Sequence, residues 1–181
     1  MNGPGDATLR LFFGVVPDAT TREHLAAVAG SLPLAADAKW VPPANFHLTL
    51  AFVGDVPASQ LPTLRALGSA RGAAAFAVRF DAFEYWPKPE VLVAAARAVP
   101  AGLQQLWQQL HRDLAVHRWA MDAKRLRPHV TLARKVSQPP VLPAMSPFEW
   151  RMENFSLIRS DTSGVHSAYT VVDTWPLLDE R

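Results

Sequence analysis

The sequence contains no cysteine among its 181 residues. Disulfide frameworks, thiolate metal sites and a cysteine nucleophile are therefore excluded. No apolar run approaches the length of a membrane span, and residues 1–10 include Gly, Pro and Asp where a signal peptide would be apolar. Hydrophobic residues make up 49% and charged residues 19%, which is typical of a globular protein rather than a disordered one. We expect a cytoplasmic protein with one domain over residues 1–181 and no membrane partner.

Several motifs of metal and cofactor enzymes are also missing. The chain has no Gly-Lys pair for a phosphate-binding loop, no GxGxxG fingerprint, no GxSxG nucleophile turn and no HExxH zinc motif. Its acidic residues are scattered, whereas metal phosphodiesterases need clusters of carboxylates and histidines. We therefore expect a protein that uses neither a metal nor a cofactor.

Positive charge is concentrated in one segment of the chain. Residues 111–140 hold seven Lys and Arg against two Asp, although the net charge of the whole chain is only +2. Arginine outnumbers lysine by fourteen to four, and a guanidinium group binds phosphate in a bidentate manner. The segment is interpreted either as a solvated basic loop or as a surface that attracts phosphate groups.

Hydrophobic patterning predicts an α+β protein. Apolar residues that alternate with polar ones over 75–83 indicate a half-buried strand, and leucines at helical spacing over 101–117 indicate an amphipathic helix. Short alternating strands favour antiparallel sheets with one solvated face. Thr20 and Glu23 have the spacing of a capping box. Further strands are expected over 9–16, 46–53, 91–96, 130–134, 155–159 and 168–175, further helices over 20–29 and 59–69, and loops over 33–45 and 136–148.

A unit of strand, helix, loop and strand occurs twice. Val16-Pro17 and Val99-Pro100, each at the end of a predicted strand, are 83 residues apart. Each unit ends in His-apolar-Thr-Leu, at 47–50 and at 129–132, and the two histidines are 82 residues apart. One such tetrapeptide would carry little weight. Two of them at the same place in a repeated unit indicate two halves that are related by a pseudo-twofold axis.

The motif has a polar face and an apolar face. Side chains alternate between the two sides of a strand, so His47 and Thr49 share one side and the apolar residues around them share the side that must be buried. The same holds for His129 and Thr131. If the halves pack about the pseudo-twofold axis, both His-x-Thr pairs face a single cleft.

Two imidazoles that face one cleft suit in-line displacement at phosphorus. One can act as a base on the entering oxygen and the other as an acid on the leaving oxygen, because histidine titrates near pH 6.5. Each proton transfer is worth roughly 10²- to 10⁴-fold in rate, and threonine hydroxyls can donate to the charged phosphate oxygens. The alternative is a pair of half-buried strand histidines with purely structural hydrogen bonds. The other histidines have no repeat partner; we expect His24, His111 and His117 at a surface or interface and leave His166 unassigned.

At these residues the sequence resembles the 2H phosphoesterase superfamily, and within it the bacterial RNA 2′,3′-cyclic phosphodiesterases, also called 2′-5′ RNA ligases. The likeness spans nearly the whole chain. The resemblance implies one domain with a bilobal, pseudo-twofold α+β fold, in which two intertwined lobes place two antiparallel sheets around a central cleft with helices outside. The stretches that carry it are 10–13, 40–52 (WVPPANFHLTLAF), 127–134 (RPHVTLAR), 155–160 and 175–177.

The resemblance also implies the reaction, namely metal-independent hydrolysis of RNA 2′,3′-cyclic phosphate ends to 2′-phosphates. In reverse, the same chemistry joins RNA ends through a 2′-5′ linkage without ATP. By this likeness His129 is the base that activates water, His47 is the acid that protonates the departing 3′ oxygen, and Thr49 and Thr131 bind phosphate oxygens. The expected partners are RNA or nucleotides with 2′,3′-cyclic phosphate ends, and we expect a monomer.

Two further positions are implied as substrate-binding residues. Arg134 matches a family arginine and Phe52 matches an aromatic position that stacks on a base, and each follows a motif histidine by five residues. Five is odd, so an ideal strand would turn both side chains away from the histidines. Either the strand ends or bulges before them, or the side chains curl over its edge. A core phenylalanine and a surface ion-pair partner are the alternatives for Phe52 and Arg134.

Other functions stay open at this point. The chain is alternatively a non-catalytic module that binds RNA ends or a phosphorylated ligand, although the presence of both histidines and both threonines argues against an inactive enzyme. It is also alternatively a 2H phosphodiesterase that acts on another cyclic phosphate or on 2′-5′-linked nucleotides. Arg125 and Arg127 either steer phosphates towards the cleft or are solvated loop charges.

Overall fold

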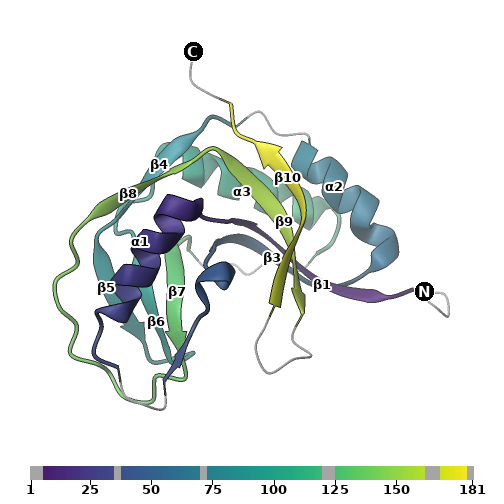
Figure 1. Ribbon diagram of the computed structural model, residues 1–181. Coiled ribbons are helices and arrows are strands. Elements are labelled where there is room, and N and C mark those ends of the chain that lie inside the picture. The colour runs from purple at the N-terminus through teal and green to yellow at the C-terminus, as the bar shows by residue number, and fades with distance from the viewer. Residues whose placement is uncertain (1–5, 35–37, 70–72, 120–124, 162–167, 179–181) are drawn as a thin grey trace.

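A large, curved antiparallel sheet forms the centre of the structure, and the helices pack against it (Figure 1). The computed structural model describes residues 6–34, 38–69, 73–119, 125–161 and 168–178. The strands are β1 (Thr8–Val15), β2 (Lys39–Trp40), β3 (Leu48–Pro57), β4 (Phe76–Phe80), β5 (Ala82–Trp86), β6 (Val91–Ala95), β7 (His129–Arg134), β8 (Phe148–Met152), β9 (Asn154–Asp161) and β10 (Ala168–Pro176). The helices are α1 (Ala19–Gly30), α2 (Leu61–Ser69) and α3 (Ala101–Val116), with short 3-10 turns η1 (Pro43–Asn45) and η2 (Ala58–Gln60).

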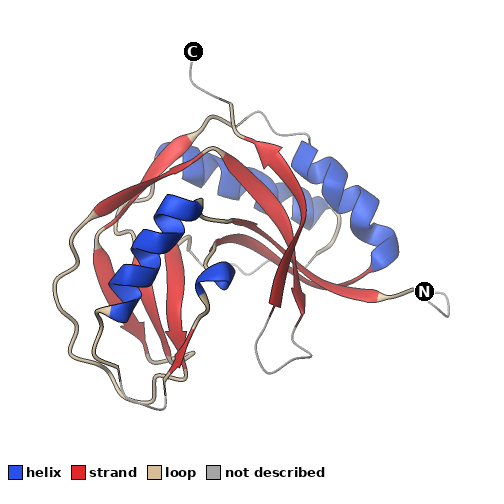
Figure 2. Cartoon of the chain, viewed as in Figure 1, coloured by secondary structure: helices blue, strands red, loops and turns tan. Residues whose placement is uncertain are grey.

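The strand order confirms the α+β fold with antiparallel sheets. The eight-stranded sheet has the order β10-β9-β1-β3-β7-β6-β5, and β2 pairs with β7. A second sheet consists of β4 and β8 (Figure 2). All pairs of named strands are antiparallel. The half β10-β9-β1-β3 meets the half β7-β6-β5 through a single register pair, Leu48 and Val130.

This register pair reveals the pseudo-twofold relation between the halves. Leu48 and Val130 are the middle residues of the two His-x-Thr motifs, so equivalent positions of the repeat pair with each other. Two antiparallel strands that pair at equivalent residues are related by a local twofold axis through that pair. In each half the strand that opens the repeated unit lies beside the strand that closes it, β1 beside β3 and β6 beside β7.

The helices are positioned by capping and by apolar faces. The carboxylate of Asp18 accepts a hydrogen bond from the Thr21 amide at 2.7 Å and caps α1, so the expected capping box at Thr20 and Glu23 was wrong. The apolar stripe expected in the third helix is confirmed, because the leucines at 103, 106, 110 and 114 are buried. None of the helices that the structure describes is long and apolar enough to cross a membrane.

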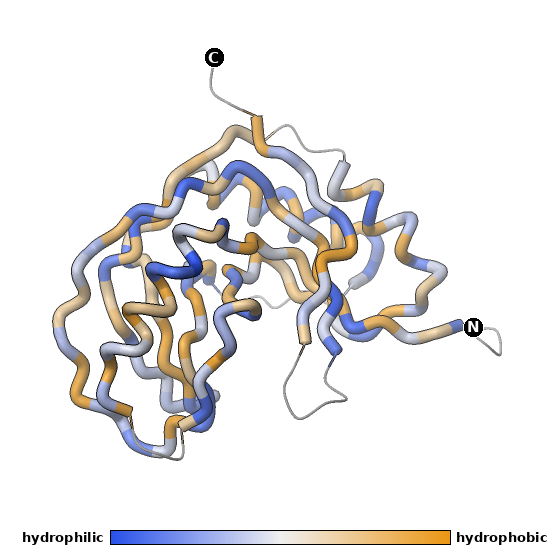
Figure 3. The backbone as a smooth tube through the Cα atoms, viewed as in Figure 1, coloured by the Kyte–Doolittle hydropathy of each residue, from blue (hydrophilic) through white to orange (hydrophobic). Residues whose placement is uncertain are grey.

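Several strands differ from the sequence prediction. β3 starts after His47 and continues beyond Gly54, because its pairing with β1 extends to Pro57. The strand expected over 75–83 is two strands in different sheets, since β4 pairs with β8 and β5 pairs with β6. β2 lies in the expected loop 33–45, and β8, which was not expected, starts at Phe148, the last residue of the expected loop 136–148. Figure 3 shows hydrophobic and hydrophilic positions interleaved along the strands, in line with the alternating burial of β4.

Candidate active site

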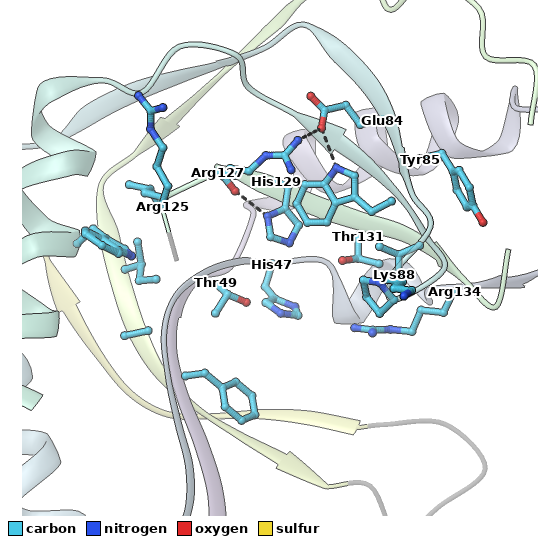
Figure 4. Close-up of a pocket in the computed structure, with 18 of the residues that line it drawn as sticks. His47, Thr49, Glu84, Tyr85, Lys88, Arg125, Arg127, His129, Thr131 and Arg134 are labelled. Carbon is cyan, nitrogen blue, oxygen red and sulfur yellow. Dashed lines mark hydrogen bonds and ion pairs between the residues drawn. The ribbon is translucent and has the colours of Figure 1, made fainter. Parts of the chain in front are cut away.

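The two motif histidines lie at the junction of the two halves of the large sheet. His47 directly precedes β3, and His129 is the first residue of β7. Both side chains are half-buried and line a cleft of about 1290 Å³ (Figure 4). Thr49 and Thr131 line the same cleft. The structure therefore brings together the four residues of the two His-x-Thr pairs.

The strand register explains why these four side chains converge. Because Leu48 pairs with Val130 in antiparallel fashion, one step along each strand sets His47 opposite Thr131 and Thr49 opposite His129. Side chains at opposite positions of an antiparallel pair project from the same face of the sheet. The apolar middle residues, Leu48 and Val130, project from the other face and are fully buried. Each histidine thus has the threonine of the other motif beside it.

Both imidazoles are held in the same way by the backbone. Nδ1 of His47 lies 2.8 Å from the carbonyl oxygen of Asn45, and Nδ1 of His129 lies 2.7 Å from the carbonyl oxygen of Arg127. A carbonyl only accepts, so in each ring Nδ1–H donates. The neutral form of each histidine therefore carries its proton on Nδ1, which leaves Nε2 as the nitrogen for proton exchange with a ligand.

Burial favours the neutral form of both histidines. The pKa of His47 is lowered from 6.5 to about 4, chiefly by burial, with the hydrogen bond to Asn45 opposing the shift and the positive charges of Arg134 and His129 adding to it. The pKa of His129 is also lowered by burial. Both shifts favour the neutral imidazole near neutral pH, whereas the sequence analysis expected one of the two rings to be protonated there.

The two histidines have different neighbours. The ring of His47 lies 4.8 Å from the ring of Phe12 and 4.8 Å from that of Tyr169. The ring of His129 lies 4.5 Å from that of Trp86. A charged pair, Glu84 and Arg127, contacts Trp86. The pseudo-symmetric backbone thus holds two chemically unlike environments.

The charged pair beside His129 consists of Glu84 and Arg127. The Arg127 guanidinium forms an ion pair with Glu84 and lies over the Trp86 ring at 4.5 Å. The indole N–H of Trp86 donates to the same carboxylate at 2.7 Å. Glu84 raises the pKa of His129 and Arg127 lowers it. The pair therefore adds opposing effects to the dominant effect of burial.

Matching bulges bring Phe52 and Arg134 to the cleft. In β3, Thr49 pairs with Gly14 and Ala51 pairs with Phe13, so Leu50 is an extra residue. In β7, Thr131 pairs with Val93 and Ala133 pairs with Leu92, so Leu132 is the extra residue at the equivalent position. A bulge of one residue reverses the strand parity. Phe52 and Arg134 consequently line the cleft with the histidines, which resolves the parity difficulty in favour of a bulge.

Several residues in the cleft wall were not expected from the sequence. His111 was placed at a surface or interface, but its side chain is half-buried in the cleft wall and its Nε2 lies 3.1 Å from the carbonyl oxygen of the bulged Leu50. Trp107 stacks on His111 with ring centroids 4.0 Å apart. Glu84, Trp86 and Lys88 also line the cleft, as do Arg125 and Arg127 from the basic segment. The sequence does contain an indication of this role, because Trp107 and His111 are four residues apart and so lie one helical turn apart, next to the leucine stripe.

Metal-ligand clusters are not found in the part of the chain that the structure describes. There, no group of three or more His, Asp or Glu side chains is arranged to hold a metal ion. The cleft instead offers two imidazoles, two hydroxyls and four basic side chains, Lys88, Arg125, Arg127 and Arg134. Such a set can bind a phosphate group and exchange protons with its oxygens.

Comparisons with known proteins agree with this arrangement. A pseudo-twofold α+β fold with one His-x-Thr pair from each half defines the 2H phosphoesterases. The family model described as LigT-like phosphoesterase matches residues 15–93. The chain is 34% identical to the RNA 2′,3′-cyclic phosphodiesterase of Thermus thermophilus, over 96% of this chain and 92% of that protein. It is 30% identical to the protein of the same name from Escherichia coli, over 93% of this chain and 96% of that protein.

A solved structure agrees with the sequence relatives. The crystal structure of Escherichia coli LigT complexed with 3′-AMP matches with a TM-score of 0.88 and 27% identity, over 94% of this chain and 99% of that chain. The protein belongs to the LigT-like phosphoesterase family.

Proposed function

We propose that this protein hydrolyses the 2′,3′-cyclic phosphate ends of RNA to 2′-phosphates by acid–base catalysis with two histidines and without a metal. The observation that carries the proposal is the convergence of two imidazoles, each with Nδ1 bound to a backbone carbonyl, on one cleft with two threonines. The names of the Thermus thermophilus and Escherichia coli relatives support the choice of substrate.

The proposed reaction is an in-line displacement. Water attacks phosphorus, the base takes a proton from that water, and the bond between phosphorus and the 3′ oxygen breaks. The acid gives its proton to the departing 3′ oxygen, which leaves a 2′-phosphate and a free 3′-hydroxyl. One histidine has gained a proton and the other has lost one, so exchange with solvent restores both. An RNA 5′-hydroxyl in place of water would give a 2′-5′ phosphodiester by the same exchange, without ATP.

Phosphate binding completes the proposed mechanism. The hydroxyls of Thr49 and Thr131 and the guanidinium of Arg134 donate to the non-bridging oxygens, which carry charge in the transition state. The negative charge of the phosphate raises the pKa of a nearby imidazole and so supplies the proton that burial disfavours in the protein alone. Phe52, which is 45% exposed, offers a ring at the cleft edge for the nucleobase.

The proposal also includes which histidine is the base and which is the acid. The family resemblance assigns the base to His129 and the acid to His47. The charges of the protein do not decide this order, because Arg127 and Arg134 lower the pKa of His129 while Glu84 raises it, and Arg134 and His129 lower the pKa of His47. A substrate with sulfur in place of the 3′ oxygen separates the roles, since a thiolate leaves without a proton. Its hydrolysis should be restored in the variant that lacks the acid and not in the variant that lacks the base.

Activity measurements test the proposal directly. Replacing His47 or His129 by Ala should lower kcat/KM on a cyclic-ended oligoribonucleotide by about a hundredfold or more, about 3 kcal/mol of transition-state stabilisation. Product analysis should find the 2′-phosphate, and EDTA should leave the rate unchanged. His117→Ala, at an exposed position, is the matched control. Full activity in either cleft variant, loss of activity in EDTA, or binding of the RNA end without turnover would contradict the proposal.

A further inference from the structure

The cleft has two ends with different walls. In Figure 4, Thr49 and Arg125 lie towards one end, and Thr131, Lys88 and Arg134 lie towards the other. The first end, here called the Thr49 end, is closed by α3. Nε2 of His111, on α3, lies 3.1 Å from the carbonyl oxygen of Leu50, the residue after Thr49. Thr49 donates to the phosphate in the proposed reaction, but Arg125 and the α3 side chains that line the cleft have no part in that chemistry.

An aromatic surface on α3 faces the Thr49 end. The helix buries its leucines at 103, 106, 110 and 114 in the core, and Trp107 and His111 lie beside this stripe, one turn apart. The indole of Trp107 packs on His111 at 4.0 Å with an interplanar angle of 34°. Both side chains are only half-buried, and both line the cleft. An indole that is supported on one side and open to a cleft is a surface on which a nucleobase can pack.

A basic side chain stands at the same end. Arg125 is exposed and lines the cleft. Arg127, two residues later, is already paired with Glu84 and packed on Trp86. None of the ion pairs within the described residues involves Arg125, so its charge is free to attract an anion. A second phosphate is the anion that an RNA chain would bring there.

We propose that Trp107 and Arg125 form a subsite for the nucleotide that precedes the cyclic-phosphate end. The indole holds its nucleobase, and the guanidinium holds the phosphodiester that joins it to the terminal nucleotide. This inference rests on the proposed function and narrows it, because the preferred substrate then has at least two nucleotides. Phe52 and Trp107 serve successive bases, while Arg134 stays with the reacting phosphate.

Substrate length is the variable that tests the subsite. We would compare kcat/KM for 2′,3′-cyclic AMP with kcat/KM for the dinucleotide ApA carrying a 2′,3′-cyclic phosphate. In Trp107→Ala and Arg125→Ala, the loss on the dinucleotide should exceed the loss on the mononucleotide by about tenfold or more. Trp107→Phe, which keeps an aromatic face, should recover most of that difference. Arg112→Ala, at an exposed position of α3 outside the cleft lining, should lose nothing on either substrate.

Salt dependence separates a phosphate contact from a structural effect. In the unmodified protein, the ratio of kcat/KM for the dinucleotide to kcat/KM for the mononucleotide should fall as the salt concentration rises. In Arg125→Ala this ratio should depend less on salt. Equal losses on both substrates, or no loss on either, would overturn the subsite while leaving the proposed function intact.

If the unmodified protein hydrolyses neither substrate, the proposed function fails instead. Fluorescence anisotropy of the labelled cyclic-ended dinucleotide then tests the subsite alone. Weaker binding to Trp107→Ala and Arg125→Ala than to Arg112→Ala supports the subsite, and equal binding by all three overturns it.

Discussion

Burial of His47 makes the stability of the protein depend on pH, and this dependence can be measured without any substrate. In the unfolded chain a histidine takes up a proton near pH 6.5, whereas the native pKa of His47 is about 4. Between these values the unfolded state binds more protons than the native state. The free energy of unfolding therefore falls as the pH drops from about 6.5 to about 4, and the contribution is constant outside this window.

The size of the effect follows from the two pKa values. The complete shift, from 6.5 to about 4, corresponds to at most about 3 kcal/mol, of which about 2 kcal/mol is already lost at pH 5. His47→Gln removes the titrating group. The difference between the free energies of unfolding of the variant and the unmodified protein should therefore shift in favour of the variant by up to about 2 kcal/mol as the pH falls from 7.5 to 5. This shift does not depend on how stable the variant is at pH 7.5.

Urea unfolding at a series of pH values measures this difference. The free energies of unfolding of the two proteins should converge, or cross, as the pH falls towards 5. His117→Gln, with the same side-chain change at an exposed position, controls for the loss of a histidine outside the cleft. Curves for His47→Gln that run parallel to those of the unmodified protein from pH 7.5 to pH 5 would refute the argument that burial controls the proton on His47.

Three further predictions concern packing and charge. Gly68→Ala should lower the free energy of unfolding by about 1–3 kcal/mol, because an added Cβ would overlap the Trp175 ring; an unchanged urea midpoint would contradict this prediction. Glu84→Gln should lower the pKa of His129, because the carboxylate raises it; NMR titration of the ring would show an equal or higher pKa if this is wrong. Arg134→Gln should raise the pKa of both motif histidines, and the same titration contradicts the charge argument if neither value rises.

The repeat is the reason why so much of the site was predictable from sequence. Two identical tetrapeptide patterns fixed which face of each strand is polar, and strand parity then set His47, Thr49, His129 and Thr131 towards one cleft. Strand parity could not predict that Leu48 pairs with Val130. It depends on how the two halves meet, and no local pattern encodes that meeting point.

Features that depend on contacts distant in sequence were not predictable. β8 is a strand because it pairs with β4, more than sixty residues earlier, although its buried Trp150 and Met152 do alternate with exposed residues. The bulges follow from the register of β3 on β1 and of β7 on β6. His111 reached the cleft because α3 packs against the Leu50 bulge. Helical periodicity could place His111 beside the core stripe but could not say what it would meet there.

A symmetric scaffold presents a difficulty for in-line displacement, which needs one base and one acid at the same time. The duplicated backbone gives both histidines the same hydrogen bond from Nδ1 and the same neighbouring threonine, and so makes them nearly equivalent. The difference between them comes from side chains that the repeat does not duplicate. His47 lies among aromatic rings, whereas His129 lies beside Trp86 and the pair of Glu84 and Arg127. In the proposed mechanism, the duplication therefore supplies two equivalent imidazoles, and the different side chains around each ring distinguish the base from the acid.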